Sequence, residues 1–188
     1  MTLPLSAYRV TQKRKPRTPK LDVVQPEDLR VRLIPLTKGH AVKVSAPRYD
    51  FLNQWHWCVY WNKCTRSFYA RMGHGGPMMH SMILDLKPGE YADHINHDTL
   101  DNTDDNLRKA TRSQNTINRR VFSNNKSGHP GVCWHSRDKE WSVYINVNGR
   151  RLSLGTFPST QKDQAIAARK AAEEQYFGEF ACNVHPSG

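Results

Sequence analysis

The sequence lacks any long apolar segment and is poor in hydrophobic residues. Only 37% of its residues are hydrophobic, and its mean hydropathy is −0.75. No stretch reaches the roughly 18 consecutive apolar residues that a membrane-spanning helix needs, which excludes a transmembrane protein. The first twenty residues carry six basic residues and three prolines in place of an apolar run. This composition predicts no secretory signal peptide and therefore a cytoplasmic protein.

The sequence also lacks a cysteine pattern typical of zinc sites or disulfide frameworks. Its four cysteines are Cys58, Cys64, Cys133 and Cys182, and no two of them form a Cys-x-x-Cys pair. The spacing therefore predicts reduced thiols and argues against a disulfide-stapled scaffold.

Acidic residues are scarce, with 17 Asp and Glu against 28 Lys and Arg, which gives a formal net charge of +11. Such an excess favours a polyanionic partner, because Lys and Arg that neutralise phosphates release condensed counterions. One block departs from this bias: residues 78–120 hold six basic and seven acidic residues. The acidic residues of this block need a chemical explanation.

Short strands are expected before this block. Residues 29–35 alternate apolar and basic side chains, and residues 41–44 form a second candidate strand. Residues 55–61 and 67–71 predict a hairpin whose aromatic side chains mainly build a small core. The chain before residue 29 is basic and proline-rich, which predicts a disordered arm.

The C-terminal third predicts a three-stranded sheet followed by one helix. The expected strands are 131–136, 140–147 and 150–157, and Asn148-Gly149 is a strong hairpin signal. Thr160 is expected to cap a helix that ends at Phe177-Gly178. A stripe of Ala165, Ala168, Ala172 and Tyr176 is expected to pack on the sheet. The predicted fold class is α+β, in five parts: a 1–28 arm, a 29–77 β-rich region, the 78–121 block, a 122–130 linker and a 131–183 β-β-β-α module.

The acidic block contains a pattern suited to phosphodiester chemistry. Asp93 places a hard oxygen ligand for Mg²⁺ beside His94, whose imidazole can take a proton from water. Asn106-Leu107-Arg108 follows thirteen residues after Asp93, and Asn115 follows after twenty-two. A cation and a base are the two components that metal-assisted hydrolysis needs.

Together with Asp101-Asn102 and Thr111, these residues resemble the motif of HNH endonucleases of the phage and intron homing type. The resemblance implies a ββα-metal nuclease motif over residues 78–121. It implies that His94 is the general base, that Asp93 and Asn115 bind Mg²⁺, and that Asn106 ties the loop together. Whether Mn²⁺ or Zn²⁺ can replace Mg²⁺ stays open.

The C-terminal module resembles the DNA-binding domain of plant ethylene-response factors, through Gly131-Val132, Trp141, 154–157 and 176–181. The implied partner is double-stranded DNA. No apolar patch or heptad repeat predicts a dimer, so we expect a monomer, and a dimer stays open as the alternative. Candidate DNA contacts are basic, polar or aromatic side chains of the two regions: Arg108, Arg112, Arg119, Arg120, Arg137, Lys139, Trp141, Tyr144, Asn146, Arg150 and Arg151. Among them Trp141 is equally a candidate core residue.

Two other functions fit parts of the sequence. A non-catalytic DNA-binding regulator would account for departures from the motif: Ser81 stands in place of Arg, His97 in place of Gly, and 103–105 in place of a basic pair. An RNA-binding or structural chain would account only for the charge and the aromatics. The sequence assigns no role to His80 or His97, and it leaves open the target site, nicking against double-strand cleavage, and a phage or intron origin.

Overall fold

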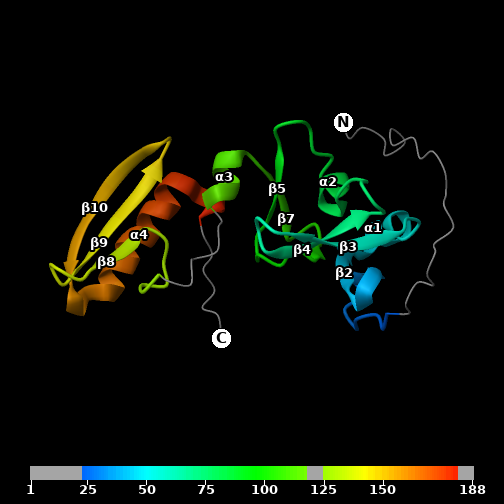
Figure 1. Ribbon diagram of the computed structural model, residues 1–188, viewed down its shortest axis with the longest axis horizontal. Helices are drawn as coiled ribbons and strands as arrows, with labels where there is room; N and C mark the ends of the chain where they lie inside the picture. The colour runs from blue at the N-terminus through cyan, green and yellow to red at the C-terminus, as the bar shows by residue number, and fades with distance from the viewer. Residues whose placement is uncertain (1–22, 118–124, 182–188) are drawn as a thin grey trace.

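The computed structural model describes residues 23–117 and 125–181, which form a mixed α+β architecture, as predicted (Figure 1). Most of the expected basic arm, together with Arg119 and Arg120, lies outside the described residues. Within the described part of the chain, no helix is long and apolar enough to cross a membrane.

The first sheet combines strands from two distant parts of the sequence. β1 (Val31–Pro35) pairs antiparallel with β2 (Ala41–Ser45), joined through the short 3₁₀ turn η2 (Thr37–Gly39). The third strand is β6 (Asp101–Asn102), which comes from the acidic block and runs parallel to β2. This pairing fixes the acidic block against the N-terminal region.

The aromatic hairpin forms where the alternation predicted it. β3 (Trp57–Asn62) pairs with β4 (Ser67–Met72), after a short helix α1 (Ala46–Leu52) that the sequence analysis did not identify. Trp57 is buried in the core, and its indole N–H donates to the carbonyl of Leu52 at 2.8 Å. Trp61 and Phe68 lie on the surface instead, 44% and 38% exposed.

The acidic block continues with α2 (Met79–Ile83), β5 (Tyr91–His94), β7 (Leu107–Ala110) and α3 (Arg112–Ile117). β5 and β7 pair antiparallel and enclose the loop that contains β6. Met79, Met82 and Leu107 join Ile34, Val42 and Val44 in one core. The β-rich region and the acidic block are therefore packed together around shared apolar side chains.

The C-terminal part is a three-stranded antiparallel sheet packed on a helix, as predicted. β8 (Val132–His135), β9 (Glu140–Val147) and β10 (Arg150–Pro158) follow in sheet order 10-9-8, and α4 (Lys162–Phe177) lies along the sheet (Figure 1). Asn148 and Gly149 form the predicted turn with φ of 50° and 77°, the left-handed values that a type I′ hairpin requires. Gly178 ends α4 with φ of 52°, also as predicted.

Two details of the predicted helix are wrong. Thr160 is not its N-cap, because a 3₁₀ turn, η3 (Ser159–Gln161), precedes the first helical residue Lys162. Tyr176 is 44% exposed and does not extend the buried stripe.

Arg169 and Glu173 are buried on that helix face beside Ala165 and Ala172. Arg169 Nε donates to Glu173 at 2.8 Å, and its Nη1 donates to the Tyr144 carbonyl at 2.6 Å. Burying such a pair is tolerated when the charges are matched and hydrogen-bonded, and these bonds pair Arg169 with the Glu173 carboxylate and the Tyr144 carbonyl.

Candidate functional site

The β5–β7 pair carries the two residues on which the predicted chemistry depends. Asp93 and His94 end β5, opposite Arg108 and Leu107 of β7, and they are only 3% and 7% exposed. Sheet pairing on β7 fixes their backbone, and the loop 95–106 begins immediately after them.

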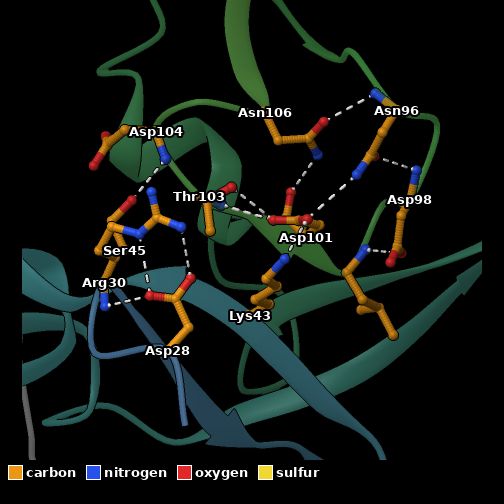
Figure 2. Close-up of polar contacts among 11 residues, drawn as sticks. Asp28, Arg30, Lys43, Ser45, Asn96, Asp98, Asp101, Thr103, Asp104 and Asn106 are labelled. Atoms are coloured by element: carbon orange, nitrogen blue, oxygen red, sulfur yellow. Dashed lines mark hydrogen bonds and ion pairs between the residues drawn. The ribbon is translucent and has the colours of Figure 1, made fainter. Parts of the chain in front are cut away.

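The loop is tied together by Asn106, the role that the motif assigns to it. Its side-chain oxygen accepts the backbone N–H of Asn96 at 2.9 Å, and its amide nitrogen donates to the Asp101 carbonyl at 2.7 Å (Figure 2). The backbone carbonyl of Asn106 also accepts the N–H of Ile95 at 3.0 Å. One buried side chain therefore joins the start, the middle and the end of the loop.

Asp101 anchors the loop to the N-terminal sheet. Figure 2 shows its carboxylate between the side chains of Lys43, Asn96 and Thr103, with Lys43 Nζ at 3.1 Å and the Thr103 hydroxyl at 2.7 Å. Burial on its own would raise the pKa of Asp101, but the bonds from Thr103 and Lys43 outweigh it and hold that pKa below its ordinary value. The carboxylate is therefore ionised at neutral pH.

His94 is held from several sides. Its Nε2 lies 2.9 Å from the side-chain oxygen of Asn102 on β6. The rings of His80 and Tyr69 pack edge-on against it, with centroids 5.4 and 6.2 Å away. Burial lowers the pKa of His94, whereas the bond to Asn102 and the charge of Asp93 act in the opposite direction.

His80 is a buried neighbour of His94. Burial, with a smaller contribution from His94, lowers the pKa of His80 to about 3. Its ring is therefore neutral at physiological pH and packs against His94 as an uncharged aromatic group.

Asp93 is paired with Arg108 in this structure. Nε and Nη2 of Arg108 donate to the same carboxylate oxygen at 2.7 and 2.6 Å. The same guanidinium lies 4.2 Å from the ring centroid of Phe180 and donates through Nη1 to the Glu179 carbonyl. Arg108 was predicted to contact phosphate, and in this structure it contacts the Asp93 carboxylate and the C-terminal part of the chain.

Asn115 lies on α3, which packs against β5. The helix begins with a reciprocal capping arrangement, in which the N–H of Thr111 donates to the Gln114 side chain and the N–H of Gln114 to the Thr111 hydroxyl. Asn115 is partly buried, and Arg112 at the start of α3 is exposed.

The donor chemistry of Asp93 and Asn115 fits a hard cation. One carboxylate and one amide oxygen are the ligand types that Mg²⁺ accepts, and Mg²⁺ usually keeps several waters besides them. Within residues 23–117 and 125–181, no cluster of three or more His, Cys, Asp or Glu side chains is arranged to hold a metal ion. A site here would therefore be of the sparse, oxygen-rich type.

The C-terminal sheet has one buried and one open face. Trp141, Val143 and Ile145 of β9 are buried, so Ser142, Tyr144 and Asn146 face away from that core. Arg151 pairs with Asn146 across the hairpin, and its guanidinium lies 4.0 Å from the ring centroid of Tyr144.

The remaining predicted DNA contacts are distributed around this sheet. Arg137 and Lys139 lie in the turn between β8 and β9, and Arg150 begins β10; all three are exposed. Trp141 is only 8% exposed and packs on Trp134, with its indole N–H donating to the Ser159 carbonyl. It is a core residue rather than part of the open face.

The contacts of Asn102 and Tyr69 with His94 were not predicted from the sequence. Asn102 was noted only as part of the motif, and Tyr69 as part of a strand and of the family resemblance. The available signal for Asn102 was its position directly after Asp101 in that motif.

Two curated proteins are distantly similar to this chain. Over 105 residues it is 34% identical to the protein named "Uncharacterized HNH endonuclease L560" of Acanthamoeba polyphaga mimivirus, covering 55% of this chain and 52% of that protein. Over 96 residues it is 28% identical to Protein 3.8 of Escherichia phage T7, covering 51% of this chain and 77% of that protein. The chain therefore spans about half the length of the mimivirus relative.

No protein-family model and no solved structure matches the chain. The distant similarity to a protein named as an HNH endonuclease agrees with the family resemblance found in the sequence. The resemblance of the C-terminal module to the plant domain stays a prediction.

Proposed function

We propose that this protein is a divalent-metal-dependent DNA endonuclease of the HNH homing type. The observation that carries the proposal is the juxtaposition of Asp93 and His94 at the end of β5, before a loop that Asn106 ties together. Distant similarity to the mimivirus protein named as an HNH endonuclease supports the same reaction class.

In this proposal His94 takes a proton from the attacking water. The water oxygen then forms a bond to phosphorus, the bond from phosphorus to the 3′ oxygen breaks, and that oxygen is protonated from solvent. Asp93 and Asn115 would hold Mg²⁺, or Mn²⁺ as the alternative ion. When bound, the cation stabilises the negative charge that develops on the phosphate. Asn106 keeps the loop closed behind His94, and Arg112 binds a neighbouring phosphate.

Arg108 neutralises the Asp93 carboxylate in this structure. If Asp93 held a cation, Arg108 would no longer be needed at that carboxylate, and its guanidinium would be available to the negatively charged DNA backbone.

The C-terminal module is proposed to bind the DNA duplex. Tyr144, Asn146 and Arg151 form an open sheet face, and the major groove is wide enough to admit strands. Arg137, Lys139 and Arg150 at the two ends of the sheet are placed for phosphate contacts. The proposed division is a nuclease part over 29–121 and a DNA-binding part over 131–183, joined by 122–130.

One observation favours a second function, that of a DNA-binding regulator without nuclease activity. Arg108 already neutralises the Asp93 carboxylate, which a metal ion would otherwise do. A centre in which this ion pair persists in the presence of metal would bind DNA without cleaving it.

A supercoiled-plasmid assay distinguishes the two functions. The plasmid carries the locus that neighbours the gene, and wild type is compared with His94→Ala, with Mg²⁺ and with EDTA. His74→Ala is the matched control, because His74 is exposed and distant in sequence from the loop. Nicked or linear product that requires both His94 and Mg²⁺, and survives His74→Ala, supports the nuclease. DNA binding without any cleavage supports the regulator and overturns the proposed reaction.

A further inference from the structure

We propose that Asn102 is a positioning residue that fixes the tautomer of His94, so that Nε2 carries the proton and Nδ1 is the nitrogen that accepts a proton from water. This inference rests on the proposed role of His94 as general base. It names the residue that orients the base and the ring nitrogen that acts.

The hydrogen bond between the two side chains determines the tautomer. The side-chain oxygen of Asn102 lies 2.9 Å from His94 Nε2. The structure places the amide oxygen of Asn102 toward Nε2, and because an amide oxygen can only accept a hydrogen bond, this orientation makes Nε2 the protonated nitrogen. A neutral imidazole has one protonated nitrogen, which leaves the lone pair on Nδ1.

The backbone of Asn102 is fixed by strand pairing, so its side chain can orient another residue. Asn102 lies on β6, which pairs in parallel with β2, while His94 lies on β5 in a separate sheet. Its side chain is 0% exposed, so water does not compete for the bond. The contact therefore links the position of the imidazole to the N-terminal sheet.

The packing around the imidazole restricts its rotation. His80 stands at 87° to the His94 ring with centroids 5.4 Å apart, and Tyr69 contacts both histidines edge-on. Turning the ring to exchange its nitrogens would require these neighbours to move.

A purely structural role accounts poorly for an asparagine at this position. Its amide nitrogen is buried, and the described residues offer it no hydrogen-bond partner. Burying an amide with an unused donor costs stability that an apolar side chain would not cost. Among the described residues, the hydrogen bond to His94 is the one side-chain interaction of Asn102 that can offset this cost.

The first experiment measures the tautomer directly and needs neither metal nor cleavage. Full-length protein with ¹⁵N-labelled histidine is studied by long-range ¹H–¹⁵N NMR at pH 7.5, and His94→Gln assigns the signals. The expected spectrum has a protonated Nε2 and an unprotonated Nδ1 at His94. A wild-type spectrum with the proton on Nδ1 overturns the proposal.

Variants then test whether Asn102 is the cause. Asn102→Leu removes the acceptor at similar size and is expected to give a mixture of tautomers, whereas Asn102→Asp keeps an acceptor oxygen and the wild-type tautomer. Thr103→Val is the matched control, since Thr103 is buried in the same loop and bonds Asp101 rather than His94. If Asn102→Leu folds and keeps the wild-type tautomer of His94, the proposal is overturned. If Asn102→Leu does not fold, the proposal is overturned when Asn102→Asp no longer has the wild-type tautomer.

Cleavage kinetics separate this inference from the proposed function. Asn102→Leu is expected to lower kcat about 10- to 100-fold, the usual effect of removing a partner that orients a reacting group, with unchanged DNA affinity. Asn102→Asp is expected to restore most of kcat. If wild-type protein never cleaves DNA, the proposed function fails while the tautomer assignment stands; if it cleaves and Asn102→Leu cleaves equally well, the positioning role fails alone.

Discussion

Arg108 donates two hydrogen bonds to one carboxylate oxygen of Asp93, at 2.7 and 2.6 Å, from the position directly opposite on the paired strand. The carboxylate is 3% exposed, so water solvates it little and the guanidinium compensates its charge. The same guanidinium packs on Phe180, the last residue of the 3₁₀ turn after α4. A proposed metal ligand is thereby connected, through one side chain, to the C-terminal module.

Removing Arg108 is expected to destabilise the protein and to increase its response to metal. Arg108→Met leaves a buried carboxylate without its cation, which typically lowers the free energy of unfolding by about 3–5 kcal/mol. Millimolar Mg²⁺ or Mn²⁺ is expected to restore part of this loss, because the cation takes the place of the guanidinium. Thermal unfolding with and without metal measures both effects.

The double variant Asp93→Asn, Arg108→Met is the control for this prediction. It has neither the carboxylate nor the guanidinium, so its unfolding temperature should not depend on divalent metal. If divalent metal raises the unfolding temperature of Arg108→Met no more than that of wild type, the assignment of Asp93 as a metal ligand is contradicted.

Elements defined by local pattern could be predicted from the sequence. The hairpins at 62–66 and at Asn148-Gly149 follow from alternation and turn residues, and Gly178 ends α4 as expected. The pair Asp93-His94 was also identified, because Asn106-Leu107-Arg108 and Asn115 follow it at the spacing of the motif.

Features that depend on distant contacts could not be predicted. β6 is only two residues long, and nothing in residues 101–102 shows that they pair with β2, 58 positions earlier. The burial of Arg169 depends on the Tyr144 carbonyl that it meets in three dimensions. The orientation of Asn102 toward His94 likewise arises only after two separate sheets have come together.

Asn106→Ala is expected to loosen the loop after β5. The change removes the acceptor for the Asn96 N–H and the donor to the Asp101 carbonyl, and leaves these backbone groups without partners. A lost buried hydrogen bond of this kind costs about 1–3 kcal/mol. Urea unfolding measures the loss, and faster amide hydrogen exchange over 95–106 localises it.

Asn146→Ala provides the comparison for that measurement, because Asn146 is an exposed asparagine on β9. Its effect on the free energy of unfolding is expected to stay within about 0.5 kcal/mol. Equal effects of the two substitutions would mean that Asn106 does not hold the loop.

The two faces of the C-terminal sheet are expected to respond differently to substitution. Arg151→Ala should weaken binding to duplex DNA and reduce the slope of log K against log salt by about 1, without a large change in stability. Trp141→Ala should instead cost about 3–5 kcal/mol of stability, since Trp141 is a large buried side chain. Fluorescence anisotropy with a labelled duplex at several salt concentrations, together with urea unfolding, measures both. An Arg151→Ala variant with wild-type affinity and salt slope would remove the open face from the proposed DNA contacts.

His129 is expected to make the stability of the C-terminal module depend on pH. It is 4% exposed, and neither ring nitrogen has a hydrogen-bond partner among the described residues. Burial, and then the positive charge of Lys170 with a smaller contribution from Arg169, lower its pKa from the ordinary value of about 6.5, although the Pro130 backbone acts in the opposite direction. The unfolded chain therefore binds a proton at a pH where the folded chain does not.

The direction of the pH effect follows from this difference in proton binding. The contribution of neutral His129 to the free energy of unfolding is complete above about pH 6.5 and is lost as the pH falls toward the lowered pKa. For one proton, the free energy of unfolding changes by at most about 1.4 kcal/mol per pH unit. His129→Leu keeps an apolar group in the site and should make the unfolding free energy less dependent on pH between 7 and 5. His135→Leu, at an exposed histidine on β8, should leave the wild-type dependence intact. Urea unfolding at several pH values compares the three proteins, and a slope in His129→Leu equal to that of wild type would show that protonation of His129 is not coupled to folding.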